Sequence, residues 1–147
     1  MKLAFGSDHA GFRLRKVLVE WARSQGNEVQ EVGANSEEPY DYPDAADAMV
    51  PIILHGDADL GVLICGTGIG MSIRANRHEG IRAAVCCSPV HAELARLHNH
   101  ANVLCLGQRT FGEPQATAIL ETFVTTGTDD AERHVRRVQK LDAAKDT

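Results

Sequence analysis

Short apolar runs alternate with longer amphipathic stretches along the whole chain, and this alternation limits the fold more than any other feature of the sequence. The runs predicted as strands cover residues 2–6, 29–32, 59–65, 81–86 and 102–106. The stretches predicted as helices cover residues 10–25, 43–55, 69–77, 89–98, 113–125 and 131–144. Because strands that alternate with helices favour a covered parallel sheet, we predict a three-layer α/β/α, Rossmann-like fold around five parallel strands.

The chain of 147 residues is long enough for one hydrophobic core. We assign residues 1–126 to one α/β domain and residues 127–147 to a C-terminal helical extension of the same domain, because the polar stretch TTGTDD separates the last helix from the rest. This helix carries a thin apolar stripe of Val135, Val138 and Leu141, so we expect it to pack on a second subunit. Pro51 lacks a backbone N–H and should kink or restart the helix that contains it.

The net charge of −5 offers no general attraction to nucleic acid or to an anionic membrane. No run approaches the roughly 18 apolar residues of a membrane span, and the first residues lack the apolar core of a secretory signal. The four cysteines show no CxxC spacing, which favours reduced thiols. We therefore expect a cytoplasmic protein that binds neither nucleic acid nor membrane.

The segment CGTGIG, residues 65–70, follows the most continuous apolar run in the chain. Such a run is typical of a parallel strand buried on both faces, so Cys65 should lie at the carboxyl end of the sheet, where α/β folds bind ligands. Glycine N–H groups at the start of the next helix would form a cradle for an oxyanion and favour the Cys65 thiolate, which could abstract a proton. The alternative is an ordinary buried cysteine before a tight turn.

Nucleotide-binding turns are the main competitors for a glycine-rich segment of this kind. GTGIGM places Met71 where the dinucleotide fingerprint has its third glycine, and no GK[ST] sequence follows for a P-loop. In GSDHAG, residues 6–11, the carboxylate of Asp8 would repel a pyrophosphate. Both nucleotide motifs therefore fit poorly.

Four polar residues follow predicted strands or helices at places that suit catalysis. Asp8 and His9 come after the first strand and suit acid–base or sugar-binding roles, although Asp8 can instead cap the first helix through the N–H of Gly11. His98 and Asn99, at a helix end, are further acid–base or sugar-contact candidates. We expect no metal site, because the histidines show no HExxH spacing and no cysteine pair accompanies them.

Three arginines are candidates for an anion site. Arg133 and Arg137 are four residues apart and share one face of the last helix, a spacing that suits a phosphate. Arg109 follows the fifth strand, where an anion site is expected. The alternative for the helical pair is a solvated surface role.

Six ordered segments resemble the family of ribose-5-phosphate isomerase B and galactose-6-phosphate isomerase. They are FGSDHAGF at 5–12, DYP at 41–43, CGTGIGMSIRANR at 65–77, GIRAAVC at 80–86, RLHNHANVLCLGQR at 96–109 and RHVRRV at 133–138. The resemblance implies an aldose–ketose isomerase that needs no metal or organic cofactor. It also implies a pocket between two subunits, and hence a homodimer or a dimer of dimers.

The resemblance also implies roles for individual residues. Cys65 would move a proton between sugar C1 and C2, while backbone N–H groups at Gly66, Gly68 and Gly70 stabilise the enediolate. Thr67 would assist proton handling at the oxygens, and His98 with Asp8 would open the sugar ring. The remaining residues would bind substrate, the phosphate by His9, Arg109, Arg133 and Arg137, and the sugar by Asn99 and Tyr42.

Position 71 bears on the choice of base. One branch of the family carries a glutamate there that replaces the cysteine as base, and Met71 cannot take that role. The other branch combines two different chains, one of which lacks the cysteine, so Cys65 favours a self-sufficient homomer. We predict interconversion of ribose 5-phosphate and ribulose 5-phosphate, with a tetrose or hexose phosphate as the alternative. The rival class is a non-catalytic module that binds a sugar phosphate or a nucleotide.

Overall fold

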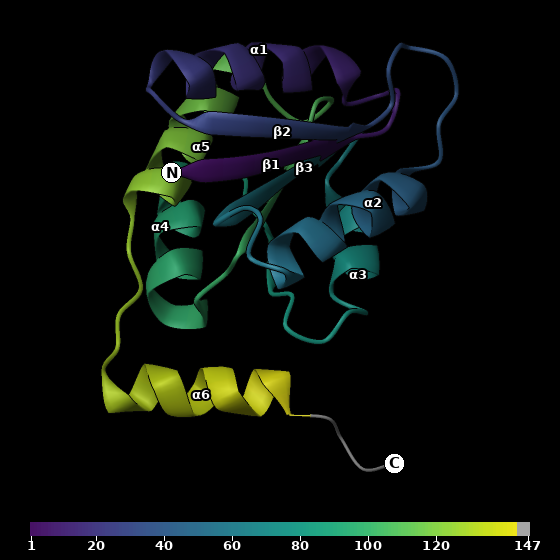
Figure 1. Cartoon of the computed structure of the whole chain (residues 1–147). Coiled ribbons are helices and arrows are strands. Elements are labelled where there is room, and N and C mark those ends of the chain that lie inside the picture. The colour runs from purple at the N-terminus through teal and green to yellow at the C-terminus, as the bar shows by residue number, and fades with distance from the viewer. Residues whose placement is uncertain (144–147) are drawn as a thin grey trace.

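The computed structural model describes residues 1–143, and its centre is a sheet of five parallel strands in the order β2-β1-β3-β5-β4 (Figure 1). The strands are β1 (Lys2–Ser7), β2 (Glu28–Gly33), β3 (Leu60–Cys65), β4 (Ala83–Val85) and β5 (Val103–Gly107). The helices are α1 (Phe12–Ser24), α2 (Tyr42–Leu54), α3 (Ile69–Ala75), α4 (Pro89–Asn99), α5 (Glu113–Thr125) and α6 (Glu132–Asp142). The predicted fold class is confirmed.

Two apolar cores hold the three layers together. One lies between the sheet and α1, α4 and α5 and includes Phe5, Leu18 and Phe123. The other lies between the sheet and α2 and α3 and includes Met49 and Leu63. Every residue of β3 and β5 is buried, which explains why the run before CGTGIG is continuously apolar rather than alternating.

The strand order places a ligand crevice between β1 and β3. The chain leaves β1 for β2 on one side, and β3 pairs with β1 on the other side. Where the order reverses in this way, the loops that follow the two strands diverge and leave a crevice at the carboxyl edge of the sheet. The fold therefore brings the residues after β1 and those after β3 to one place.

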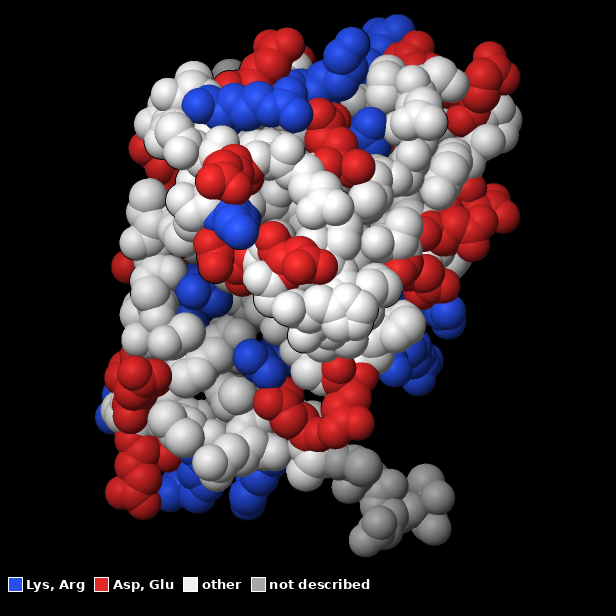
Figure 2. All heavy atoms as spheres, in the orientation of Figure 1, with Lys and Arg blue, Asp and Glu red and all other residues white. Residues whose placement is uncertain are grey.

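Helix α6 lies apart from the three layers, beside the end of α4 (Figure 1). His134 and Val138 are buried on the side that faces its own chain, whereas Leu141 is 60% exposed. The apolar stripe is therefore divided, because Val138 already packs within its own chain. Basic side chains gather along the outer edge of α6, at the bottom of the view in Figure 2.

Two local predictions differ from the structure. Helix α2 does not restart at Pro51 but continues through it, because a proline removes only its own N–H donor and the next turn still closes through His55 N–H on Pro51 O at 2.9 Å. Strand β4 is shorter than predicted, since the N–H of Arg82 donates to the side chain of Asn102 before the ladder begins. Ala144, the predicted end of the last helix, lies outside the described residues. Within residues 1–143, no helix is long and apolar enough to cross a membrane.

Candidate active site

A cavity of about 480 Å³ opens at the carboxyl ends of β1 and β3. Five segments line it, namely the loops after β1, β3 and β5, the start of α2 and the first turns of α3. The lining residues are Asp8, His9, Ala10, Tyr42, Cys65, Gly66, Thr67, Ile69, Gly70, Ile73 and Arg109. Eight of these residues, the polar ones and the glycines, were predicted from the sequence as site residues. We call these eight residues the Cys65 cluster. Ala10, Ile69 and Ile73 carried no sequence signal that distinguished them from other apolar residues.

Cys65 differs from the other buried thiols in its surroundings. Burial, assisted by Cys87, raises the pKa of Cys86 to about 12, and burial raises the pKa of Cys105 well above its usual range. These two thiols therefore stay protonated. Cys65 is only 4% exposed but lines the cavity, and its Sγ accepts a hydrogen bond from the N–H of Gly68 at 3.1 Å.

Gly68 gives the loop the shape that this hydrogen bond requires. It adopts a left-handed conformation with φ of 79° and precedes the first residue of α3. A Cβ at this position would lie 3.0 Å from the backbone carbon of Leu106 on the neighbouring strand. A side chain here is therefore disfavoured by the backbone conformation and crowded by the neighbouring strand.

The backbone N–H groups of the CGTGIG loop divide into occupied and free donors. Gly68 donates to Cys65 Sγ, and Ile69 donates to Thr67 Oγ1 at 3.2 Å. Within residues 1–143, the N–H groups of Gly66, Thr67 and Gly70 donate to no protein acceptor. The predicted contribution of Gly68 to an anion cradle is therefore directed to the thiol instead, and the donors left for an anion are these three.

The loop after β5 extends the sheet pairing past the end of β3. Gln108 N–H donates to Cys65 O at 2.9 Å, and Arg109 N–H donates to Gly66 O at 3.0 Å. The guanidinium of Arg109 lies against Gly66, since a Cβ there would be 3.0 Å from Nη1. A positive charge is thereby placed at the mouth of the glycine loop.

Asp8 and His9 are both fixed by backbone groups. Asp8 is buried and accepts a hydrogen bond from Gly11 N–H at 2.9 Å, so the capping contact considered for it exists, and Asp8 nevertheless lines the cavity. His9 Nδ1 lies 3.1 Å from Tyr40 N and 3.2 Å from Tyr40 O, so the backbone of Tyr40 fixes the ring in either tautomer.

Tyr42 reaches the cavity from the first residue of α2. Its ring lies so close to Gly70 that a Cβ there would be 2.6 Å from ring carbon Cε2. Gly70 therefore makes room for the tyrosine as well as offering a free N–H.

Apart from Gly68, which lies in the glycine loop, four predicted site residues lie away from the cavity. His98 and Asn99 end α4, while Arg133 and Arg137 lie on α6, and none of the four lines the cavity at Cys65. We call them, together with His134, the α4–α6 cluster. The ring of His98 stacks on that of His134 with centroids 4.4 Å apart and planes 6° from parallel.

His134 was missed by sequence reasoning. It is four residues before Val138 and seven before Leu141, so it shares their face of the helix. That spacing was the available signal, but a histidine does not count as apolar in a hydrophobic stripe.

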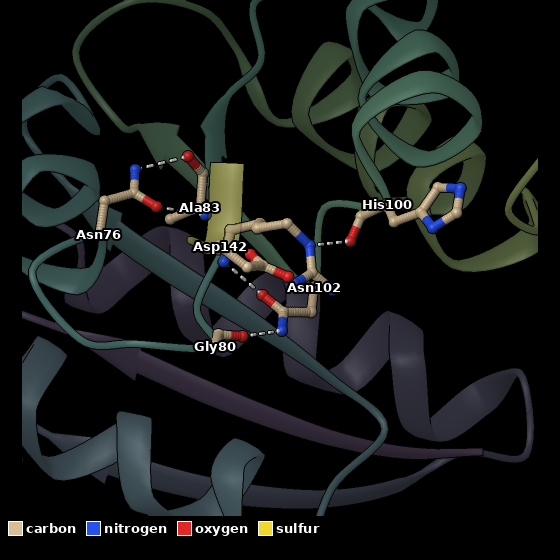
Figure 3. Close-up of polar contacts among 7 residues, drawn as sticks. Asn76, Gly80, Ala83, His100, Asn102 and Asp142 are labelled. Atoms are coloured by element: carbon tan, nitrogen blue, oxygen red, sulfur yellow. Dashed lines mark hydrogen bonds and ion pairs between the residues drawn. The ribbon is translucent and has the colours of Figure 1, made fainter. Parts of the chain in front are cut away.

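A second cavity, of about 380 Å³, lies between β4, the end of α4 and the end of α6, and Asn99 lines it. Arg82 joins these elements, because Nη1 donates to Asp142 at 2.8 Å and Nε donates to His100 O at 3.0 Å (Figure 3). Asn102 supports Arg82 by accepting its N–H and by donating to Gly80 O, both at 2.8 Å. This network holds the end of α6 against its own chain.

The chain matches a family model described as Ribose/Galactose Isomerase over residues 3–141. It is 42% identical to the ribose-5-phosphate isomerase B of Escherichia coli strain K12 over 142 residues, which are 97% of this chain and 95% of that protein. It is 38% identical to a putative sugar phosphate isomerase of Rickettsia conorii over 95% of this chain and 96% of that protein.

Solved structures agree with these matches. The ribose 5-phosphate isomerase of Thermotoga maritima superimposes with a TM-score of 0.93 at 49% identity and covers 96% of this chain and 97% of that one. The type B ribose 5-phosphate isomerase of Trypanosoma brucei superimposes with a TM-score of 0.94 at 44% identity, over 98% of both chains. On the family model, the sequence relatives and the fold, the chain belongs to the ribose/galactose isomerase family.

Proposed function

We propose that this chain is an aldose–ketose isomerase that interconverts ribose 5-phosphate and ribulose 5-phosphate through a cis-enediolate, with Cys65 as the base. The observation that carries the proposal is the Cys65 sulfur at the wall of the cavity, held at 3.1 Å by Gly68 N–H and adjacent to free N–H donors. The names of the relatives in Escherichia coli and Thermotoga maritima support the choice of sugar.

The proton transfer needs a base on one side of C1 and C2 and hydrogen-bond donors at their oxygens. The Cys65 thiolate takes the proton from C2 of the open-chain aldose and returns it to C1, while O1 gains a proton and O2 loses one. The charge that develops on the oxygens is stabilised by the N–H groups of Gly66, Thr67 and Gly70. Thr67 Oγ1 already accepts from Ile69 N–H, so its own hydrogen is free to donate to a substrate oxygen.

A second copy of the chain completes the pocket in this proposal. His98, Asn99, Arg133 and Arg137 do not line the Cys65 cavity, yet their chemistry suits ring opening and phosphate binding. Ile69 and Ile73, at the rim of the cavity, are 55% and 54% exposed, and exposed apolar side chains beside a site mark a contact surface. We therefore infer a homodimer, alone or as half of a dimer of dimers, with two composite pockets.

The phosphate ligands would come from both copies. His9 and Arg109 line the cavity of one subunit, and Arg133 and Arg137 would reach it from the partner's α6. Because all four cysteines are free thiols, we place the reaction in the reducing cytoplasm.

A screen of four-, five- and six-carbon aldose phosphates tests the proposal. We expect the highest kcat/KM with ribose 5-phosphate, measured as formation of the ketose. Replacement of Cys65 by Ala should lower kcat about 10²- to 10⁴-fold, the usual contribution of a positioned acid–base group. Cys105→Ala is the matched control, since Cys105 is buried in the adjacent strand β5 and does not line the cavity.

Three outcomes would change the assignment. Full activity of the Cys65→Ala variant would exclude the thiol mechanism. A preference for a four- or six-carbon substrate would replace the pentose. Binding of sugar phosphates without turnover of any of them would identify a binding module instead of an isomerase.

A further inference from the structure

Two histidine rings from different helices are in face-to-face contact in the α4–α6 cluster. His98 is exposed at the end of α4, whereas His134 on α6 is only 4% exposed. Their centroids are 4.4 Å apart and their planes differ by 6°. One face of the exposed His98 ring is therefore covered, which restricts the directions in which its nitrogens can point.

The segment that carries α6 is tied to α4 on both sides of this contact. Arg96 Nε donates to Thr126 O at 3.1 Å, and Asp129 N–H donates to Leu97 O at 3.2 Å. His100 Nε2 lies 2.9 Å from Asp129 O and must carry the proton there, because a carbonyl only accepts. These three contacts fix the start of α6 to the end of α4, so the stacked position of His134 is built into the chain.

His134 acts through the face of its ring rather than through its nitrogens. Neither ring nitrogen has a hydrogen-bond partner among residues 1–143, and the nearest carboxylate, Asp129, has Oδ2 3.5 Å from Nε2. Burial lowers the pKa of His134, and the charges of Arg133, His98 and, more weakly, Arg137 lower it further, against an opposing effect of Asp129. The ring is therefore held neutral at pH 7, and His98 can accept a proton without a like charge beneath it.

We propose that His134 is a positioning residue that sets the ring plane of His98 for opening the closed form of the sugar phosphate. This inference rests on the proposed isomerase function, in which His98 acts at the sugar ring. In ring opening the bond between C1 and the ring oxygen breaks, that oxygen gains a proton and the C1 hydroxyl loses one. The step needs a correctly directed imidazole but no oxidant or reductant.

Two variants of similar volume test whether His134 acts through the flat face of its ring or only by filling space. His134→Phe keeps a planar ring without nitrogens, and His134→Leu fills the space without a planar face. We expect His134→Leu to lower the rate of ribose 5-phosphate conversion about tenfold, a part of the 10²- to 10⁴-fold typical of an acid–base group. His134→Phe should stay within about twofold of wild type.

The second readout is a step that needs no ring opening. Ribulose 5-phosphate is acyclic, because its C5 oxygen carries the phosphate, so incorporation of solvent deuterium at its C1 reports the Cys65 proton transfer alone. His134→Leu should retain this exchange at close to the wild-type rate while conversion of the aldose falls.

The remaining outcomes would contradict either the positioning role of His134 or the proposed isomerase function. Equal activity of the Phe and Leu variants, or parallel loss of conversion and exchange in His134→Leu, would show that His134 has only a structural role. Absence of both conversion and exchange in the wild-type protein would instead remove the proposed isomerase function.

Discussion

Backbone contacts between loops hold the Cys65 cluster, whereas contacts that mostly involve side chains hold the α4–α6 cluster. In the first, a Cβ on Gly11 would lie 2.1 Å from Ile64 O, and a Cβ on Gly107 would lie 2.6 Å from Thr67 Cα. In the second, α6 is held by the histidine stack and by an ion pair between Arg82 and Asp142, whose side chains are 23% and 37% exposed.

In the proposed homodimer, this difference shows how the two halves of a composite site would be assembled. The Cys65 cluster is an extension of the sheet, so its geometry is fixed when the sheet forms. The α4–α6 cluster lies at the end of α4 and on α6, which is outside the three layers, and in the proposed homodimer a second subunit would bring it to the Cys65 cavity. Changes to the glycines that shape the Cys65 cluster should damage the fold, whereas changes in the α4–α6 cluster should impair ring opening or phosphate binding and leave the sheet intact.

Mixing two inactive variants would test the composite pocket and should give the largest effect. Cys65→Ala and His98→Ala should each retain at most about one percent of wild-type activity on ribose 5-phosphate. After co-refolding, half of the dimers should be mixed and carry one intact pocket of two, so activity should return to about a quarter of wild type. Conversion of ribose 5-phosphate per total subunit is the measurement.

A second mixture serves as the control. Cys65→Ala combined with Thr67→Ala should stay inactive, since both changes lie in the same cluster and every pocket of the mixed dimer then carries one of them. Failure of the first mixture to recover would mean that both clusters act within a single chain.

Gly11→Ala should cause the next largest effect, on stability. The added Cβ meets backbone atoms of Ile64 that cannot move without distorting β3, so we expect the free energy of unfolding to fall by about 3 kcal/mol. The matched control is Gly127→Ala, in the connection to α6. Its added Cβ meets nothing within 4 Å, so the free energy of unfolding should change by less than about 0.5 kcal/mol. Urea unfolding measures both, and equal midpoints would contradict the rigidity inferred for the Cys65 cluster.

Arg137→Ala should raise KM for ribose 5-phosphate about tenfold and change kcat less than about threefold, because the phosphate is remote from the reacting carbons. Arg136→Ala is the matched control, since Arg136 is exposed on the same helix and has no role in the proposed pocket. Steady-state kinetics decides the matter. An unchanged KM for Arg137→Ala would remove that residue from the phosphate site.

Asp142→Asn should give the smallest effect. The Arg82–Asp142 ion pair is partly exposed, and such pairs contribute about 0.2 to 1 kcal/mol. We expect KM to rise no more than about twofold and the unfolding midpoint to shift slightly. A rise in KM as large as that of Arg137→Ala would show that this single contact determines where α6 lies.

The sheet and the Cys65 cavity were predictable because their signals are local. The apolar run before Cys65 identifies a strand buried on both faces, and the glycines after it identify a loop that must pass close to other backbone. The use of Gly68 N–H for the thiol rather than for a ligand depends on its φ of 79°, which the sequence allows but does not require.

The placement of the α4–α6 cluster could not be predicted from the periodicity of the sequence. His98 and Arg137 are 39 positions apart in the chain, and their common location depends on how residues 126–131 fold back onto α4. His134 was overlooked for a related reason, since burial of a histidine follows from its stacking partner and not from its own polarity. The roles of the individual residues in the reaction stay predictions.

In a random mutant library, Gly11 and Gly107 would be scored among the most essential positions of the chain, although neither carries a group that can act on a sugar. Their intolerance comes from the backbone atoms of Ile64 and Thr67 that occupy the space of any side chain. A genetic screen for loss of growth would therefore group these glycines with Cys65. Only the amount of folded protein recovered from each mutant would distinguish the positions that build the pocket from Cys65, the position proposed to perform its chemistry.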